Sequence, residues 1–198
     1  MKKSCLAFAL SFFAGLNADA ATIIRGFEDR PAGAFTTQYA EFTITTDTVG
    51  GNLEIQSFAQ FAAEGSNFLT IMVPSSGGAV GNGIFTAAAG YELLGVSFNG
   101  IESAFGVSVA NVSLFTSGGV SLGVLNVLAP GANTTAVNMD FSSYGSVGRF
   151  EVRNVTDGGG FAIDRIVVNA VPEPSAFSLL VLGFGGVVAL RRVRRKAD

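Results

Sequence analysis

The chain lacks the residues on which most catalytic and metal sites depend. It has no histidine and no tryptophan, and its one cysteine, Cys5, lies close to the N-terminus. Residues 21–174 contain neither cysteine nor lysine. These absences exclude Ser-His-Asp and Cys-His sites, Ser-Lys dyads, Schiff bases and His- or Cys-bound zinc from that region. There is also no phosphate loop and no dinucleotide-binding fingerprint.

The residue types present do not exclude one enzyme class, glycoside hydrolases that use a pair of carboxylates. Such an enzyme also needs a cleft that holds a sugar. The chain has no tryptophan and only three tyrosines to stack on sugar rings. We therefore expect a protein that is not an enzyme and that needs no cofactor, with a carboxylate-pair hydrolase as the alternative.

Charge is scarce and uneven along the chain. Residues 21–174 hold five arginines and thirteen acidic residues, a net charge of −8, whereas the whole chain has −3. A lysine-free acidic surface argues against nucleic acid and anionic lipid as partners. It is compatible with divalent cations and with a polysaccharide matrix.

The N-terminus has the three parts of a secretory signal peptide. Lys2 and Lys3 form a basic start, Leu6–Leu16 is apolar, and Ala18-Asp19-Ala20 fits the small-residue cleavage site. The sequence therefore predicts a signal peptide over residues 1–20, recognised at Ala18 and Ala20 and cleaved after Ala20. An uncleaved N-terminal anchor is the alternative.

The C-terminus, residues 171–198, also has three parts. Pro172-Glu173-Pro174 is stiff because proline fixes φ. The uncharged run Ser175–Leu190 would span about 24 Å as a helix, somewhat short of a hydrocarbon core of about 30 Å, and snorkelling arginines can cover the difference. We expect a single transmembrane helix here, with a buried helix of a globular domain as the alternative. The expected membrane stop is formed by Arg191, Arg192, Arg194 and Arg195.

Together these three parts resemble the PEP-CTERM sorting signal of exported bacterial proteins. The resemblance implies that Pro172, Glu173 and Pro174 are recognised by an exosortase, a membrane protease-transpeptidase that acts near this motif. It implies a precursor anchored transiently in the inner membrane, and then a protein at the cell surface or in the extracellular matrix. Members of the family are commonly linked to exopolysaccharide and biofilm. A permanently anchored surface protein without processing is the alternative.

Between the two signals, residues 21–170 have the pattern of short strands. Apolar and β-branched runs alternate with Gly, Asn and Ser, and no amphipathic helix of ten or more residues is visible. Arg149–Arg153 alternates, with Phe150 and Val152 inward. Ser117-Gly118-Gly119 predicts a hairpin turn between two strands. The strands are expected in Thr22–Phe27, Phe35–Thr46, Phe68–Val73, Ile84–Ala88, Tyr91–Phe98, Phe105–Phe115, Val120–Leu128, Thr135–Phe141, Arg149–Arg153 and Phe161–Asn169, whereas Leu53–Phe61 fits a strand or a helical turn.

About ten short strands predict an all-β fold, a β-sandwich of jelly-roll type. The signal-peptide helix would precede it and the transmembrane helix would follow it. The 13 phenylalanines of residues 21–174 are expected in the core rather than in a stacking role. Strand inward faces are expected at Phe27, Phe42, Phe98, Phe150 and Phe161.

Three acidic residues are candidate calcium ligands. Glu28 and Asp29 follow the first expected strand, and Asp164 lies in the last. Jelly rolls often place these two strands side by side, so the carboxylates could bind a structural Ca²⁺. The alternative is an ion-pair cluster with Arg25, Arg30 and Arg165.

Three segments fit the N-glycosylation pattern, but a sequence rich in Asn, Ser and Thr matches it by chance, and we expect them to be unmodified. They begin at Asn111, Asn133 and Asn154. The whole pattern predicts an exported, non-catalytic β-sandwich of the cell surface or matrix. A carbohydrate-binding module for matrix polysaccharide is the alternative, and the missing tryptophan counts against it.

Overall fold

The computed structural model describes residues 21–63, 65–73, 81–132, 134–157 and 162–171. Within them the chain is all-β: twelve strands form two antiparallel sheets, and the one helical element is a short 3-10 turn, η1 (Ser142–Tyr144). Residues Ala21–Ala170 form one compact unit. The all-β prediction is confirmed, whereas the jelly-roll type and the terminal helices stay predictions.

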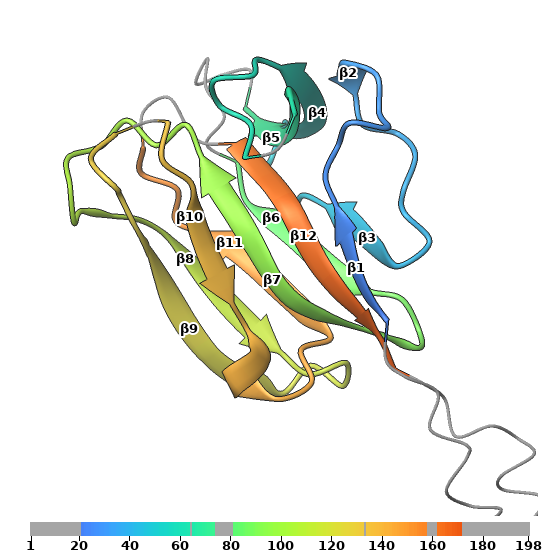
Figure 1. Cartoon of the computed structure of the whole chain (residues 1–198). Coiled ribbons are helices and arrows are strands. Elements are labelled where there is room, and N and C mark those ends of the chain that lie inside the picture. Colours follow the sequence, from blue (N-terminus) through green and yellow to red (C-terminus); the bar gives the residue numbers. More distant parts are fainter. Residues whose placement is uncertain (1–20, 64, 74–80, 133, 158–161, 172–198) are drawn as a thin grey trace, which may run out of the picture. The chain divides into compact units, whose positions relative to one another are not determined.

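The seven-stranded sheet has the order β10-β7-β12-β5-β4-β2, and β1 pairs with β12 beside it. In Figure 1 its strands β7, β10 and β12 form the front layer. The bounds are β1 (Thr22–Arg25), β2 (Gly33–Ala34), β4 (Asn52–Ser57), β5 (Asn67–Met72), β7 (Tyr91–Asn99), β10 (Val137–Asp140) and β12 (Ala162–Ala170).

The five-stranded sheet has the order β3-β6-β11-β8-β9 and lies behind β7 and β12 in Figure 1. Its strands alternate between buried and more exposed positions, so one face packs on the other sheet and the opposite face meets solvent. The bounds are β3 (Phe42–Thr45), β6 (Gly83–Ala87), β8 (Ser108–Phe115), β9 (Ser121–Leu128) and β11 (Arg149–Arg153).

Aromatic side chains fill the space between the sheets. Phe85 of β6 stacks on Phe150 of β11 with ring centroids 4.4 Å apart, and Phe141 lies 5.4 Å from Phe150. Phe98 of β7, in the other sheet, belongs to the same core cluster and is fully buried. Each such side chain contributes about 2–3 kcal/mol through its apolar area. Since no disulfide is available to residues 21–170, this packing carries the stability.

Most strand predictions are confirmed, with bounds that differ by up to three residues. The hairpin of β8 and β9 closes through hydrogen bonds from Thr116 N to Val120 O (2.9 Å) and from Gly119 N to Thr116 O (3.0 Å). In the segment Leu53–Phe61 the strand alternative is correct as far as Ser57. The expected strand Phe35–Thr46 is wrong in its first half, because Gln38 bonds its amide to the backbone of Ile44 and holds a loop there.

The first and last strands lie side by side, as expected. Thr22 pairs with Asn169, Arg25 pairs with Ile166, and Ala170 N donates to Ala21 O at 3.0 Å. The register of β12 shifts between Asp164 and Val167. At this point β12 changes its neighbour from β5 to β1, and Arg165 adopts a positive φ of 44°.

Candidate functional site

The solvent face of the five-stranded sheet is organised by β11. Phe150 and Val152 are buried, so Arg149, Glu151 and Arg153 point to the opposite side. The sequence predicted this alternation correctly. A strand in the middle of a sheet therefore displays two arginines and a carboxylate in one line.

The neighbouring strands continue three cross-strand rows, in which amides and hydroxyls stand beside Ile84, Phe115 and Val124. Arg149 lies between Thr86 and Phe115, and Glu151 lies between Ile84 and Ser113. Arg153 pairs with Asn111, which pairs with Asn126 on the edge strand β9. We call this surface the polar face; it consists of Thr43, Thr45, Ile84, Thr86, Asn111, Ser113, Phe115, Val124, Asn126, Arg149, Glu151 and Arg153.

Ion pairs fix the charged line. Glu151 Oε1 lies 3.2 Å from Arg149 Nε, and Glu151 Oε2 accepts from Arg153 Nη2 at 2.9 Å. Arg153 Nη1 donates to both oxygens of Asp47, at 2.6 and 2.5 Å. The hydrogen bond from Arg153 holds the pKa of Asp47 below its ordinary value, and the same bond raises the pKa of Arg153. The formal charges of these two arginines and two carboxylates cancel.

Arg149 has a second partner, because its guanidinium lies 4.4 Å from the centroid of the Phe115 ring. A guanidinium over an aromatic face is attracted by the ring, and its N–H groups can still donate hydrogen bonds in the guanidinium plane. The polar face thus combines fixed guanidinium, amide and hydroxyl donors with carboxylate and amide acceptors. That combination suits a neutral ligand with many hydroxyl groups.

Two of the three expected calcium ligands, Glu28 and Asp164, accept hydrogen bonds from the backbone. Glu28 accepts from the backbone of Ser66 (2.7 Å) and Asn67 (2.6 Å). Asp164 is buried and accepts from the backbone of Ala63 at 3.0 Å. Among the residues that the structure describes, no group of three or more His, Cys, Asp or Glu is placed to hold a metal ion. The calcium site stays a prediction.

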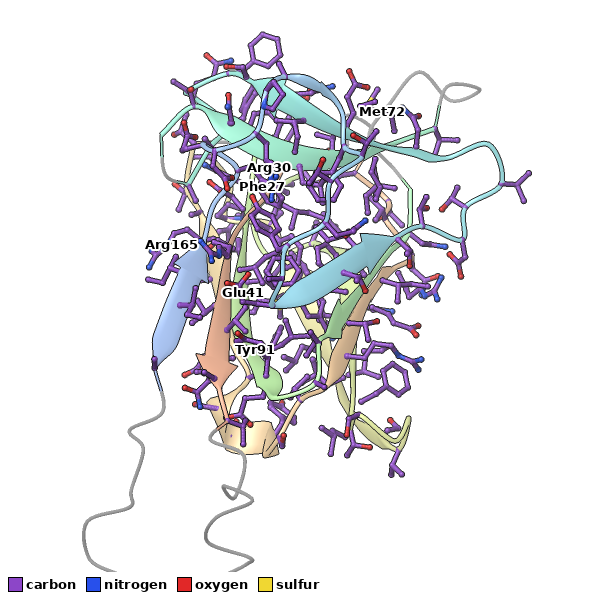
Figure 2. The ribbon with its side chains drawn as sticks, turned by 90° about the vertical axis from the view of Figure 1, so that its right-hand side faces the viewer. Phe27, Arg30, Glu41, Met72, Tyr91 and Arg165 are labelled. Atoms are coloured by element: carbon purple, nitrogen blue, oxygen red, sulfur yellow. The ribbon has the colours of Figure 1, made fainter. Side chains whose placement is uncertain are left out.

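The arginine cluster that was the alternative is partly formed. Arg30 Nε lies 3.6 Å from Asp29 Oδ1, whereas Arg25 pairs with Glu41 at the start of β3. Arg165 lies beside the end of β1, and Arg30 and Glu41 lie between β1 and β3 (Figure 2). A pocket of about 280 Å³ adjoins this cluster and is lined by Ile24, Arg25, Gly26, Glu28 and Asp29.

The sorting and anchoring residues cannot be placed. Ala18, Ala20, the motif Pro172-Glu173-Pro174 and the expected span Ser175–Leu190 lie outside the described residues. The same holds for Arg191, Arg192, Arg194 and Arg195. In the described part of the chain, no helix is both long and apolar enough to cross a membrane.

The expectation that phenylalanines belong to the core is correct for Phe27, Phe42, Phe98 and Phe150, which are fully buried; Phe161 lies outside the described residues. It is wrong for Phe105, which is 82% exposed, and for Phe58, which is 56% exposed. Both follow strand-like runs but lie in turns. The Gly after Phe105 was the one signal in the sequence that could have indicated this.

No family model and no curated protein matches this chain. Among solved structures, it is similar to the K2 cleaved adhesin domain of Lys-gingipain, with 15% identity over 75% of this chain and 99% of that one and a TM-score of 0.49. A DUF4465 family protein from Bacteroides caccae gives 12% identity, 75% and 98% coverage and a TM-score of 0.44. A family 29 carbohydrate-binding module gives 9% identity, 78% and 91% coverage and a TM-score of 0.40. Likenesses at this level carry no information about ligands.

Proposed function

We propose that residues 21–170 form a non-catalytic domain that binds a neutral polysaccharide through the polar face. The observation that carries this proposal is the line Arg149, Glu151 and Arg153 among neutral amides and hydroxyls. The cancelled charges favour a neutral ligand, and a domain of net charge −7 disfavours a polyanion.

A binding role is supported over a catalytic one by the charges of the polar face. A glycosidase needs one carboxylic acid whose pKa is raised so that it can donate a proton. Asp47 has a lowered pKa, and Glu151 is held by two arginines. Both carboxylates are therefore suited to accept hydrogen bonds from sugar hydroxyls.

The test is binding of the intact chain to soluble polysaccharides by calorimetry and affinity electrophoresis. We expect binding to a neutral β-glucan or galactan and none to alginate, a polyuronate. Asn126→Ala should weaken that binding about tenfold, because an amide with two donors and an acceptor is lost. Asn52→Ala, an exposed strand asparagine on the other sheet, is the matched control. Equal affinity of the two variants, or preference for alginate, would refute the proposal.

We also propose that the chain reaches the surface or matrix as a sorted precursor. The support is the tail, in which Pro172-Glu173-Pro174 follows within two residues of the end of β12. Replacement of the motif by Ala-Ala-Ala should leave full-length chain in the membrane, as judged by intact mass of the membrane and released fractions. Unchanged release would reject sorting, and wild-type chain of full length in the membrane would favour permanent anchoring.

A further inference from the structure

One aromatic side chain is displayed to solvent by a turn that holds it firmly. Phe105 lies between β7 and β8 and is 82% exposed, the highest value among the exposed phenylalanines of the described chain. Exposed apolar area of this size weakens solubility and gives no stability to the fold. An exposed ring on a rigid support is available for contact with a ligand.

Backbone hydrogen bonds fix the turn. Val107 N donates to Ala104 O at 3.1 Å, and Gly106 has a φ of 78°. The turn is then tied to the end of β9, since Gly106 N donates to Ala129 O (2.9 Å) and Ala129 N donates to Val107 O (2.8 Å). The position of Phe105 relative to the five-stranded sheet is thus set by backbone geometry.

A buried carboxylate accepts hydrogen bonds from the residues just before the turn. Asp157 is only 1% exposed, and its Oδ2 accepts from Glu102 N (3.0 Å), Ser103 N (2.9 Å) and Ser103 Oγ (2.8 Å). Burying a carboxylate is costly unless several donors satisfy it, and such bonds to a charged acceptor are strong. The chain segment that leads into Phe105 is therefore held in place before any ligand binds.

The neighbours of Phe105 extend the apolar surface. Val107 is 48% exposed and Leu128 is 49% exposed, and Gly131 lies so close that an added Cβ would be 3.1 Å from the Cβ of Phe105. We call Phe105, Val107 and Leu128 the Phe105 patch. It has no charged residue, and no lysine is present in residues 21–170 to attract an anionic membrane.

The Phe105 patch is continuous with the polar face. Leu128 pairs with Ser108, and Asn126, two residues earlier on β9, pairs with Asn111 in the row that contains Arg153. Two residues along a strand span about 7 Å. The turn of Phe105 is hydrogen-bonded to Ala129, the residue after Leu128, so an extended ligand that lies along β9 can reach from the patch to the row of amides.

We propose that Phe105 is the stacking platform of the polysaccharide site. The C–H face of a neutral pyranose packs on the Phe105 ring, while hydroxyl groups of the same chain reach Asn111, Asn126 and Arg153. This inference rests on the proposed function and names the residue that gives the site its affinity for a sugar ring. A flat ring held on a rigid turn contributes contact area at little cost in conformational entropy.

The absence of tryptophan provides a direct test. Phe105→Trp makes the intact chain a single-tryptophan protein whose emission reports on that position alone. We expect a blue shift and a change in intensity when soluble β-glucan or galactan is added. Phe58→Trp, at an exposed phenylalanine outside the patch, is the matched reporter and should not respond.

The second test measures the polysaccharide affinity of alanine variants. Phe105→Ala should weaken polysaccharide binding about tenfold or more, whereas Phe58→Ala should stay within twofold of wild type. Circular dichroism should be unchanged for both, because the side chains lie outside the core.

Binding lost in Asn126→Ala but kept in Phe105→Ala would overturn the inference and leave the proposed function intact. No binding by wild type to any neutral polysaccharide would reject both. A Phe105→Trp response to phosphatidylethanolamine–phosphatidylglycerol vesicles alone would assign the patch to lipid and overturn the inference.

Discussion

At the scale of single residues, the pair Arg25 and Glu41 decides how the domain responds to acid. Glu41 is buried, and the hydrogen bond from Arg25 holds its pKa below the ordinary 4.5. A depressed pKa in the folded state gives stability that is present above the unfolded value and is lost as the pH falls through the folded one. The domain therefore has a stabilising contact that fails below about pH 4.5.

We expect Glu41→Gln to be less stable than wild type at pH 7 by about 1–2 kcal/mol, a modest value because Arg25 is partly exposed. Its unfolding free energy should also fall less between pH 5 and pH 3. Arg25→Gln removes the donor and should flatten the same profile. Urea unfolding at several pH values measures both. If both variants keep the wild-type slope, the pair does not control acid sensitivity.

Tyr39 affects the stability of the domain at alkaline pH, as Glu41 does at acid pH. Burial raises its pKa to about 12, and its one hydroxyl proton is shared between Gly26 O, 2.8 Å from the hydroxyl oxygen, and Asp29 Oδ1, 2.9 Å from it. A raised pKa gives stability that is complete below the unfolded value of 10.0 and is lost as the pH rises toward 12. Tyr39→Phe should cost about 1–2 kcal/mol at pH 8. It should also show a flatter loss of stability from pH 10 to 12.

The check is a pair of urea titrations across this range, together with phenolate absorbance. The difference spectrum, wild type minus Tyr39→Phe, should show ionisation later than that of free tyrosine. A difference that titrates near pH 10 would contradict the burial argument.

The environments of single residues were also the least predictable from the sequence. The alternation Phe42-Thr43-Ile44-Thr45 predicted inward and outward positions correctly, but it indicated nothing about Glu41 being buried. That burial depends on Arg25, which is 16 positions away along the chain. Asp157, whose hydrogen-bond partners are more than fifty positions away, is the same case. A residue's own neighbours in sequence cannot reveal a partner brought close by the fold.

At the scale of elements, one glycine allows the β8–β9 hairpin to pack beside the loop that precedes β11. A Cβ added at Gly148 would lie 2.4 Å from Ser117 N and 2.5 Å from Ser117 Cα, both backbone atoms that cannot rotate away. We expect Gly148→Ala to lower the unfolding free energy by about 2–3 kcal/mol, as overpacking does. It should also lower polysaccharide affinity, because the hairpin strands carry part of the polar face.

Gly118→Ala, in the turn of the same hairpin, is the matched control. Its added Cβ would meet only Thr116 Oγ1 at 3.8 Å, an ordinary contact. Thermal unfolding should place this variant within about 0.5 kcal/mol of wild type. Equal melting temperatures of the two variants would show that the close approach at Gly148 is absorbed by small shifts.

The turn that carries Phe105 makes a further element prediction. Asp157→Asn keeps the shape of the side chain but replaces a charged acceptor with a neutral one for three donors. We expect a loss of about 1–2 kcal/mol and a weaker response of Phe105→Trp to polysaccharide. Hydrogen exchange of the Glu102 and Ser103 amides measures the loosening directly. Unchanged exchange at these amides would mean that the turn does not depend on the carboxylate charge.

Elements themselves were predictable where the pattern was local. Arg149–Arg153 and the glycine-centred hairpin follow from alternation and turn chemistry. The loop around Gln38 does not, because it depends on side-chain hydrogen bonds to the backbone of Ile44, six residues further on. The shift in β12 at Arg165 does not either, because it occurs where β12 changes its neighbour from β5 to β1. The polar face is intermediate, since each strand's outward residues were readable but the order β3-β6-β11-β8-β9 was not.

At the scale of the whole domain, the two ends of residues 21–170 and the Phe105 patch lie at opposite ends of β7. Tyr91 pairs with Ala170, which is hydrogen-bonded to Ala21, and Asn99 pairs with Ala162 at the far end, before the turn of Phe105. Figure 1 shows β7 and β12 running the length of the front layer between these two ends. The Phe105 patch therefore lies at the opposite end of β7 from the paired residues Ala21 and Ala170.

The closeness of the ends makes the domain suitable for circular permutation. Ala170 N is hydrogen-bonded to Ala21 O at 3.0 Å, so a flexible linker of about four residues can join them without strain. New ends between Gly118 and Gly119 fall in an exposed turn, where cuts are best tolerated. We expect this permutant of residues 21–170 to fold with the circular dichroism of the linear domain, to lose about 1–3 kcal/mol and to keep its polysaccharide affinity.

A second permutant, opened between Phe150 and Glu151, is the control. It divides β11, which pairs with β6 on one side and β8 on the other and contributes Phe150 to the core. This permutant should not fold, because both ladders and the aromatic stack are interrupted. If it folds as well as the Gly118 permutant, then β11 is not the central support of the polar face. If neither folds while the linear domain does, the pairing of β1 with β12 depends on the order in which the chain is connected.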